Sequence, residues 1–252
     1  KITKKTKAIM TVDLYGQLCN YDEIKKIAKG HNLAVVEDAC QAVNAEFNGK
    51  KAGSYGDIAG FSFYATKNIA CGEGGIITTD NEDYAENAKL FRQHGRSKMT
   101  SYEYTNLGYN YRTTDISAAI MLEQLKKIDF ITKKRIENAA YLSDGLKNVK
   151  GIKVPFAGEG TRHVFHQYTI RVDEFKISRD KLAEHLSEKG IGCGVYYPKP
   201  LHLLEHFRKF GYKEGDFPVA EKASKEVLSL PVHPYLTTKQ MDYIIKTIAE
   251  LE

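Results

Sequence analysis

The chain has 252 residues, of which 42% are hydrophobic and 27% charged, as in globular proteins with one large core or two smaller ones. No run approaches the roughly 20 apolar residues of a membrane-spanning helix, and the basic opening KITKKTK precedes no signal-peptide cleavage pattern. The net charge of +5 comes without a basic run interleaved with aromatic residues. We therefore expect neither a membrane nor a nucleic acid as a partner.

The cysteine and histidine residues indicate no metal centre. The four cysteines are far apart and form no CxxC pair: Cys19, Cys40, Cys71 and Cys193. This spacing argues against a zinc site or a disulfide framework and favours a reducing, cytoplasmic setting. Two histidine pairs, His163/His166 and His202/His206, lack the further ligand that a metal site needs.

Apolar, β-rich runs alternate with helical patterns through the first half of the chain. The sequence predicts buried strands over residues 8–12, 33–36, 59–63 and 75–79. Helical spacing predicts helices over 21–30 and 81–95, the second capped by Asp80 or Asn81. Strands that alternate with helices indicate an α/β fold, with a mostly parallel sheet flanked by helices on both faces.

A long helical pattern over residues 115–142 follows, with Thr114 as its N-cap. Because this length exceeds the usual globular range, we expect the helix to join a large domain (1–130) to a smaller α+β domain (131–252). In the smaller domain the sequence predicts an antiparallel sheet and three helices. The expected strands are 167–172 and 192–197, and the expected helices are 178–189, 219–228 and 238–251, the last with a capping box at its start.

The segment LAVVEDACQA places polar side chains at the end of a buried strand, where ligands of open α/β sheets bind. Glu37 and Asp38 follow four apolar residues, and Gln41 comes three residues later. One interpretation is an acidic residue that caps a helix. The other is a carboxylate that keeps a ring nitrogen protonated, as pyridoxal 5'-phosphate (PLP) requires for its role as an electron sink.

A second segment, GDIAGFSFYATKNIACGEGG, places Ser62 in a strand and Lys67 in the loop after it. Most loop lysines simply face solvent. This loop is nearly neutral and lies between two apolar strands, where desolvation would lower the pKa of a lysine that forms a Schiff base. The Ser62 hydroxyl could bind a phosphate, and the glycines would let the backbone approach a cofactor closely.

Five segments in order resemble the DegT/DnrJ/EryC1/StrS family of PLP-dependent sugar aminotransferases, on the fold-type I PLP scaffold. They are VDLYGQ (12–17), VEDACQA (36–42), FSFYATKN with the following GEGG (61–75), LGYNYRTTDISAA (107–119) and LSLPVHPYLT (228–237). The resemblance implies a PLP-dependent transferase-like fold, with a mixed, mostly parallel sheet and a smaller C-terminal domain.

The resemblance also implies roles for individual residues. Lys67 would carry PLP covalently and move protons, and Asp38 would pair with the pyridinium nitrogen. Gln41 would contact the 3′ side of the ring, and Ser62 would bind the phosphate. Asn110 would reach the cofactor phosphate of the other subunit, in a homodimer with shared active sites.

Three further residues are weaker candidates near the substrate: Tyr64, Arg112 and His163. His163 lies in HVFHQY, similar to a family segment near the site, and a hydrogen-bonded core histidine is an equally good interpretation. The resemblance implies transfer of an amino group, with L-glutamate as donor, to a nucleotide-linked keto-sugar in polysaccharide biosynthesis.

Two alternatives remain in the same family, and one outside enzymes. Sugar dehydratases typically carry histidine in place of Lys67, whereas aminobenzoate-type synthesis would share the lysine. A non-catalytic regulatory homologue would be expected to have lost part of the Asp38–Ser62–Lys67 set. The chain departs from the family at Thr113 and Ser117, and we expect it to lack the upstream part of the large domain with its phosphate loop.

Overall fold

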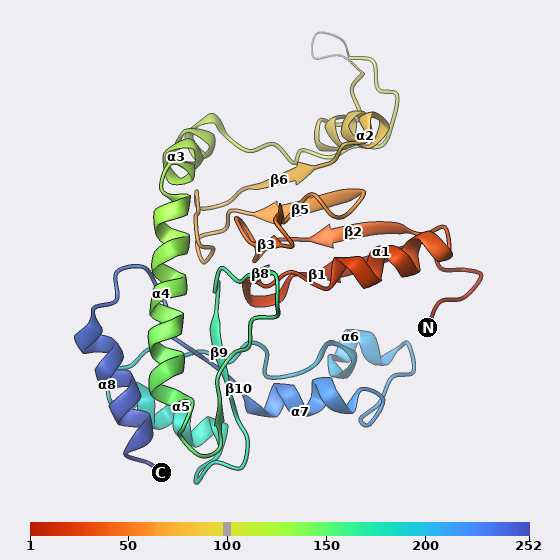
Figure 1. Ribbon diagram of the computed structural model, residues 1–252. Coiled ribbons are helices and arrows are strands. Elements are labelled where there is room, and N and C mark those ends of the chain that lie inside the picture. The colour runs from red at the N-terminus through yellow and green to blue at the C-terminus, as the bar shows by residue number, and fades with distance from the viewer. Residues whose placement is uncertain (98–101) are drawn as a thin grey trace. The chain divides into compact units, whose positions relative to one another are not determined.

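The computed structural model describes residues 1–97 and 102–252, which form two compact units (Figure 1). The first unit comprises residues 1–132 together with 157–166, and the second comprises 133–156 together with 167–252. This division differs from the expected one, because the chain returns to the first unit at 157–166. In the described ranges, no helix is long and apolar enough to cross a membrane.

A four-stranded sheet organises the first unit. Its strands are β1 (Ala8–Val12), β2 (Ala34–Asp38), β5 (Ile58–Ser62) and β6 (Gly75–Thr78). Their order is β1-β2-β5-β6, with the first three parallel and β6 antiparallel to β5. The mixed, mostly parallel sheet predicted from the sequence is confirmed, and each strand begins and ends within two residues of its predicted bounds.

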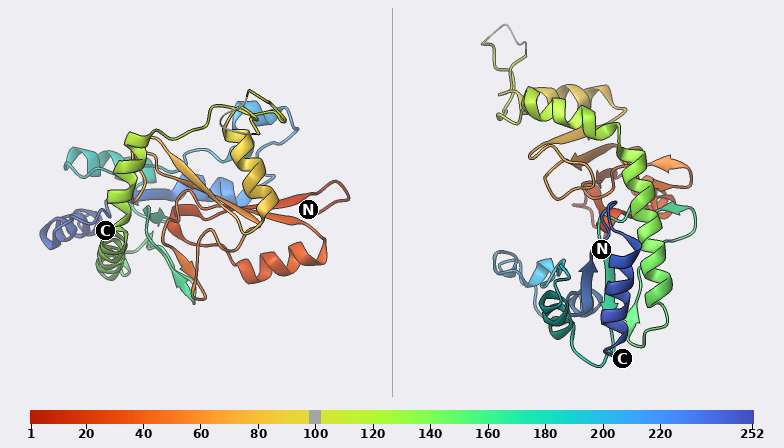
Figure 2. Two further views of the ribbon diagram at one scale, coloured as in Figure 1. Left: turned by 90° about the horizontal axis from the view of Figure 1, so that it is seen from above. Right: turned by 90° about the vertical axis from the view of Figure 1, so that its left-hand side faces the viewer.

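Two helices lie against opposite faces of this sheet (Figure 2). Helix α1 (Tyr21–Gly30) begins at an Asn20 cap, and its buried side chains join the core beneath β1 and β2. Helix α2 (Glu82–Arg92) begins at an Asn81 cap and ends three residues before the predicted stop, Gly95.

A small antiparallel sheet explains why residues 157–166 belong to the first unit. Its strands are β3 (Glu46–Phe47), β4 (Lys50–Lys51) and β8 (Thr161–Arg162), with β3 in the middle. Arg162 Nη1 also lies 3.1 Å from a carboxylate oxygen of Glu46. These short strands carry too little periodicity to be recognised in the sequence.

The predicted long helix is two helices, α3 (Asp115–Leu125) and α4 (Ile128–Leu146). The prediction of one continuous helix over 115–142 was therefore wrong. Lys126 keeps a helical backbone, but the next amide, Lys127 N–H, donates to the Gln124 carbonyl in a tighter i,i+3 turn. Neither proline nor glycine marks this break, so the apolar pattern runs through it unchanged.

The second unit has an antiparallel sheet of β10 (Val227–Leu230), β9 (Tyr168–Val172) and β7 (Ile152–Lys153), in that order. Its helices include α5 (Arg179–Glu188), α6 (Glu205–Arg208), α7 (Pro218–Glu226) and α8 (Thr238–Ala249). The predicted capping box of the last helix is present between Thr237 and Gln240.

One strand prediction for this unit was wrong. Residues 192–197 form a single bridge, Gly194 to Ser229, instead of a strand. The Tyr196 ring folds over Gly194, where an added Cβ would lie 2.7 Å from it, and so the segment is not extended. The helix expected around 219–228 is confirmed as α7; it ends two residues early, at Glu226, because the buried residues that follow pair with β9 as a strand.

Candidate active site

Asp38 is the last residue of β2, at the carboxyl ends of the parallel strands. Its Cα lies opposite those of Val12 on β1 and Gly60 on β5. The half-buried carboxylate accepts a hydrogen bond from the Cys40 N–H at 3.1 Å. A Cβ built on Gly60 would have no neighbour within 4 Å, so there is room beside the Asp38 carboxylate for a planar group.

Ser62 is the last residue of β5 and faces the same side of the sheet as Asp38. Residues two apart on a strand share a face, and Gly60 is the register partner of Asp38. The Ser62 Oγ accepts the N–H of Tyr64 at 3.3 Å, and the Tyr64 side chain is exposed. A carboxylate and a hydroxyl from neighbouring strands therefore lie on one face, at one edge.

Lys67 lies in the loop from β5 to β6. Its N–H donates to the Tyr64 carbonyl at 2.9 Å, and the loop is closed where the Cys71 N–H donates to the Phe63 carbonyl at 3.0 Å. Behind Lys67, Ile69 is buried in a cluster with apolar side chains of α3 and α4. The loop is thus fixed at its closure and at its back, and Lys67 itself is half-buried.

Electrostatics place Lys67 and Asp38 in the same region. Burial raises the pKa of the Cys40 thiol to about 11, and the hydrogen bond and negative charge of Asp38 add to this shift. The Lys67 ammonium acts on the same thiol and lowers its pKa. Because Coulomb interactions fall off with distance, one thiol responds to both charges only if both lie near it.

Gln41 joins the loops that follow β1 and β2. Its Oε1 accepts the N–H of Tyr15 at 2.7 Å, and Tyr15 has a left-handed backbone with φ 59°. The next residue, Gly16, has φ +100°, and its carbonyl accepts the Val164 N–H at 2.9 Å. The side chain expected at the 3′ side of a PLP ring therefore also accepts a hydrogen bond from the VDLYGQ loop.

His163 makes its hydrogen bond within its own turn. Its Nδ1 accepts the Phe165 N–H at 2.9 Å, and the two rings stack with centroids 4.0 Å apart. Burial lowers the pKa of His163 to about 4, so its ring is neutral near pH 7. This bond supports a left-handed Phe165 with φ 46°, and it favours the core-histidine interpretation of His163.

Asn110 and Arg112 are exposed and lie beside the end of α2. Asn110 pairs with Gln93 in an isolated bridge, and its Oδ1 accepts from Arg112 Nε at 2.7 Å. Within residues 1–97 and 102–252, no hydrogen bond or ion pair joins either side chain to Asp38, Ser62 or Lys67. The site within one chain therefore consists of residues from β2, β5 and the loops after them.

Two glycines of the predicted cofactor loop are needed for contacts inside the protein. A Cβ on Gly75 would lie 2.8 Å from the Phe61 carbonyl oxygen, and one on Gly74 would lie 2.7 Å from Cys71 Sγ. Both positions exclude a side chain because neighbouring strands and the buried thiol approach closely. This reason differs from the close cofactor approach expected from the sequence.

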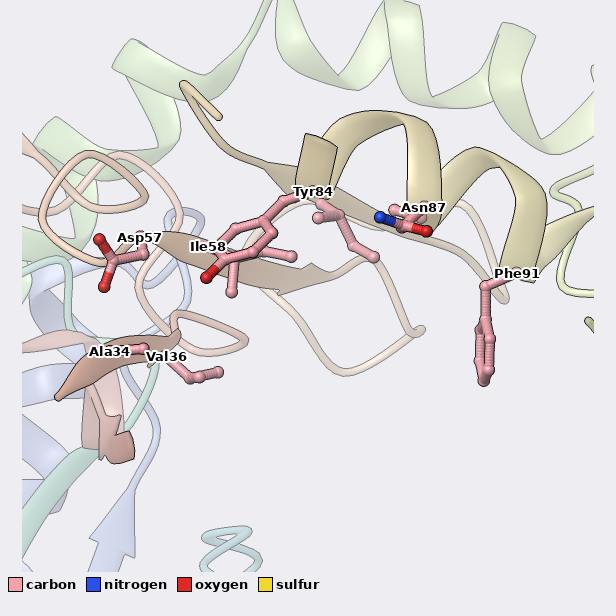
Figure 3. Close-up of a pocket in the computed structure, with 9 residues that line it drawn as sticks. Ala34, Val36, Asp57, Ile58, Tyr84, Asn87 and Phe91 are labelled. Atoms are coloured by element: carbon pink, nitrogen blue, oxygen red, sulfur yellow. The ribbon is translucent and has the colours of Figure 1, made fainter. Parts of the chain in front are cut away.

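A groove of about 400 Å³ lies on the same face of the sheet, under α2 (Figure 3). Apolar residues of the sheet line one side, and residues of α2 line the other; they include Val36, Ile58, Ile77, Tyr84 and Phe91. None of the predicted site residues lines it. The groove and the candidate site are therefore separate features of one face.

Sequence reasoning missed Asn68, whose amide Nδ2 donates to the Val164 carbonyl at 3.1 Å. It noted His166 only as half of a possible metal pair, whereas His166 Nδ1 lies 3.4 Å from Asn68 Oδ1. Over residues 1–97 and 102–252, no three His, Cys, Asp or Glu side chains are grouped as metal ligands. The one signal for Asn68 was its position next to Lys67.

Comparisons with known proteins agree on one family. The model of the DegT/DnrJ/EryC1/StrS aminotransferase family matches residues 1–249. A pleiotropic regulatory protein of Geobacillus stearothermophilus is 45% identical, over 99% of this chain and 66% of its own. A GDP-perosamine synthase of Caulobacter vibrioides is 37% identical, over 99% of this chain and 67% of its own.

Solved structures share the fold. The crystal structure of DesV from Streptomyces venezuelae, in complex with a ketimine intermediate, superposes with a TM-score of 0.93 at 34% identity. The match covers 99% of this chain and 66% of that one. The chain therefore spans about two thirds of the length of the relatives that it matches.

Proposed function

The chain belongs to the DegT/DnrJ/EryC1/StrS aminotransferase family, which uses PLP, and from this premise we propose that it is most of a sugar-nucleotide aminotransferase. In this proposal an amino acid, with L-glutamate as the expected donor, supplies an amino group to a nucleotide-linked keto-sugar. The observation that carries the proposal is the placement of Asp38 and Ser62 on one face, with Lys67 in the adjoining loop.

The residues present fit PLP as a cofactor. A carboxylate, a hydroxyl and a primary amine are the groups that its ring nitrogen, phosphate and aldehyde require, and Gly60 leaves space beside the carboxylate. Asp38 would hold the ring nitrogen, Ser62 the phosphate and Lys67 the aldehyde carbon. When bound, PLP supplies the electron sink that stabilises a carbanion at the amino-bearing carbon.

The chain's own residues then supply proton transfer and orientation. Lys67 Nζ would take up and return the proton of the amino-bearing carbon, as an amine in a partly desolvated loop can. The Asp38 carboxylate would keep the ring nitrogen charged, and Gln41 would contact the 3′ side of the ring from a fixed loop. Tyr64, Arg112 and His163 remain proposals for the substrate side.

The test of the proposal is covalent attachment at Lys67. The 252-residue chain is incubated with PLP, reduced with borohydride and mapped by peptide mass spectrometry. We expect the adduct at Lys67 in the unmodified chain and in Lys89→Ala, a control lysine on α2 with a 60% exposed side chain. Lys67→Ala should lose it. Adducts spread evenly over surface lysines in all three proteins would refute the proposal.

We also propose a homodimer in which Asn110 of one copy completes the site of the other. The segment around Asn110 exposes many large apolar side chains, as an interface would: Tyr102, Leu107, Tyr111, Ile116 and Leu122. Mixing Lys67→Ala with Asn110→Ala protein should restore activity that neither has alone, because one site of each mixed dimer has both residues. Absence of complementation in a verified mixed dimer would contradict shared sites.

A second candidate function is a non-catalytic regulator that keeps the fold, because the relative at 45% identity is described as a pleiotropic regulatory protein. The retained Asp38, Ser62 and Lys67 favour the enzyme. Lys67 argues against a sugar dehydratase, because the dehydratases of this family typically carry histidine at that position. PLP attachment without turnover of any keto-sugar would favour the regulator.

A further inference from the structure

Asn68 follows Lys67 directly, and both ends of its amide contact a distant segment of the chain. Nδ2 donates to the Val164 carbonyl at 3.1 Å across 96 positions of sequence. Oδ1 lies 3.4 Å from His166 Nδ1 across 98 positions. One side chain thus joins the lysine loop to residues 164–166.

The two contacts fix the orientation of the amide and the tautomer of the histidine. A carbonyl oxygen can only accept, so Nδ2 of Asn68 must face Val164. Oδ1 then faces His166, and because it also can only accept, the proton of a neutral His166 ring lies on Nδ1. Both contacts are satisfied by a single arrangement, so the link has a defined geometry.

Residues 163–166 form a rigid support for this link. Val164 is completely buried, and its N–H donates to the Gly16 carbonyl at 2.9 Å. A Cβ on Gly16 would lie 2.8 Å from Val164 Cγ2 and 3.0 Å from the His166 nitrogen, so the two segments touch. His163 fixes the turn between them through its bond to Phe165 N–H.

The other described restraints on the lysine loop act within the loop or on its apolar side. The backbone of Lys67 bonds within the loop, to Tyr64, and Ile69 anchors the loop on its apolar side. We propose that Asn68 is a positioning residue: by binding Val164 and His166 it fixes the backbone from which Lys67 reaches the site. This inference rests on the proposed function, in which Lys67 Nζ must meet the cofactor at Asp38 and Ser62.

The test compares Asn68→Ala and Asn68→Asp with Asn87→Ala as a matched control. Asn87 is an exposed residue of α2 whose Nδ2 donates to the Asp83 carbonyl at 2.8 Å. Asn68→Asp keeps the size and the acceptor toward His166 but loses the donor toward Val164. Three quantities are measured on the 252-residue chain: the rate of PLP attachment at Lys67, the pH at which the adduct's absorbance band shifts, and amide hydrogen exchange.

We expect both Asn68 variants to slow attachment at Lys67 roughly tenfold and to move the pH of the band shift, since loss of one partly buried hydrogen bond has effects of this order. Asn87→Ala should match the unmodified chain. Equal attachment rates and band shifts in all proteins would overturn the inference and leave the proposed function intact. Should Asn68→Ala fail to fold, the attachment rate and band shift of the isosteric Asn68→Asp test the inference.

If the unmodified chain attaches no PLP at Lys67, the proposed function has failed, and hydrogen exchange still tests the link. The Lys67 amide, bonded to the Tyr64 carbonyl, should exchange roughly tenfold faster in Asn68→Ala than in Asn87→Ala. An unchanged exchange rate there, with the amides of β5 equally protected in both, would show that Asn68 does not restrain the loop.

Discussion

The two faces of the four-stranded sheet differ although the same strands form both. Toward α1, Thr11, Asp13, Val35 and Glu37 are all buried. On the opposite face, where α2 lies, Met10 is 68% exposed, and Val12 and Ile77 are 48% and 57% exposed. Side chains alternate along a strand, so on β1 and β2 a difference of one position decides whether a residue enters the core or a more open surface.

Two neighbouring carboxylates show what this alternation does. Glu37 is fully buried, and its carboxylate accepts the backbone N–H groups of Gly53, Tyr55 and Gly56. Asp38, the next residue, is half-buried and accepts the Cys40 N–H. The two acids are chemically similar. They differ in the face of the sheet on which they lie, which places Glu37 in the core and Asp38 at the candidate site.

The largest expected effect on the open face is that of Asp38→Asn. An amide cannot keep the ring nitrogen of PLP protonated, so we expect turnover to fall about 1000-fold, or about 4 kcal/mol, if the proposed function holds. Asn Oδ1 can still accept from Cys40 N–H, so the free energy of unfolding should change by less than about 0.5 kcal/mol. Steady-state kinetics and urea melts check both values; full turnover in the variant would remove Asp38 from its role.

On the closed face, Glu37→Gln should destabilise the chain by roughly 2–4 kcal/mol. Glu37 is fully buried, so the new NH₂ group would face backbone N–H groups and leave some of them without an acceptor. Equilibrium denaturation in urea measures the loss. A change below about 1 kcal/mol would mean that the Gly53–Gly56 turn does not depend on this carboxylate.

Asp13 makes the stability of the closed face depend on pH. Burial raises the pKa of its carboxyl to about 7; N–H donation from Cys19 opposes the shift, and the charge of Glu37 adds to it. A raised pKa means that the folded state binds the proton more tightly than the unfolded state does. The resulting stability is full below the ordinary value of 3.8 and is lost as pH rises through about 7.

We therefore expect the free energy of unfolding to fall by on the order of 2 kcal/mol between pH 5 and 8. Asp13→Asn, which cannot titrate, should flatten this dependence. Urea melts of both proteins at the two pH values provide the measurement. The same slope in both proteins would assign the pH dependence to other groups.

The smallest effect should come from Met10→Ala on the open face. Met10 is 68% exposed, and a surface substitution of this kind typically changes stability by less than about 0.5 kcal/mol. Its counterpart is Val35→Ala, one strand away on the closed face and 4% exposed, which should lose about 2 kcal/mol. Similar losses in the two variants would contradict the difference between the faces.

Sequence patterns predicted the parts of the fold that depend on local periodicity. The strands of the large sheet, the Asn81 cap and the Thr237–Gln240 capping box all follow from short-range patterns of apolar and polar residues. The break at Lys126–Lys127 and the folding back of Tyr196 onto Gly194 could not be predicted in this way. At Lys126–Lys127 neither a proline nor a change in hydrophobic period marks the break, and at Tyr196 the outcome depends on where its ring packs.

For the candidate site, the carboxyl ends of β2 and β5 could be predicted because parallel strands end at one edge. The link from Asn68 to Val164 and His166 could not, because it joins residues 96 and 98 positions apart through side-chain contacts. The different fates of Glu37 and Asp38 depend on which face α1 covers. The sequence shows two adjacent acids but does not indicate which of them lies on the face covered by α1.

The return of residues 157–166 to the first unit has a consequence for synthesis on the ribosome. The strands that carry Asp38 and Ser62 emerge early, but the support for Asn68 lies at Val164 and His166. The lysine loop therefore cannot reach its final restraints until α4 and β7 have also been made. Such long-range closure slows folding, and a nascent chain stopped before residue 164 would carry the chemical groups of the site on a loop that lacks the Asn68 contacts.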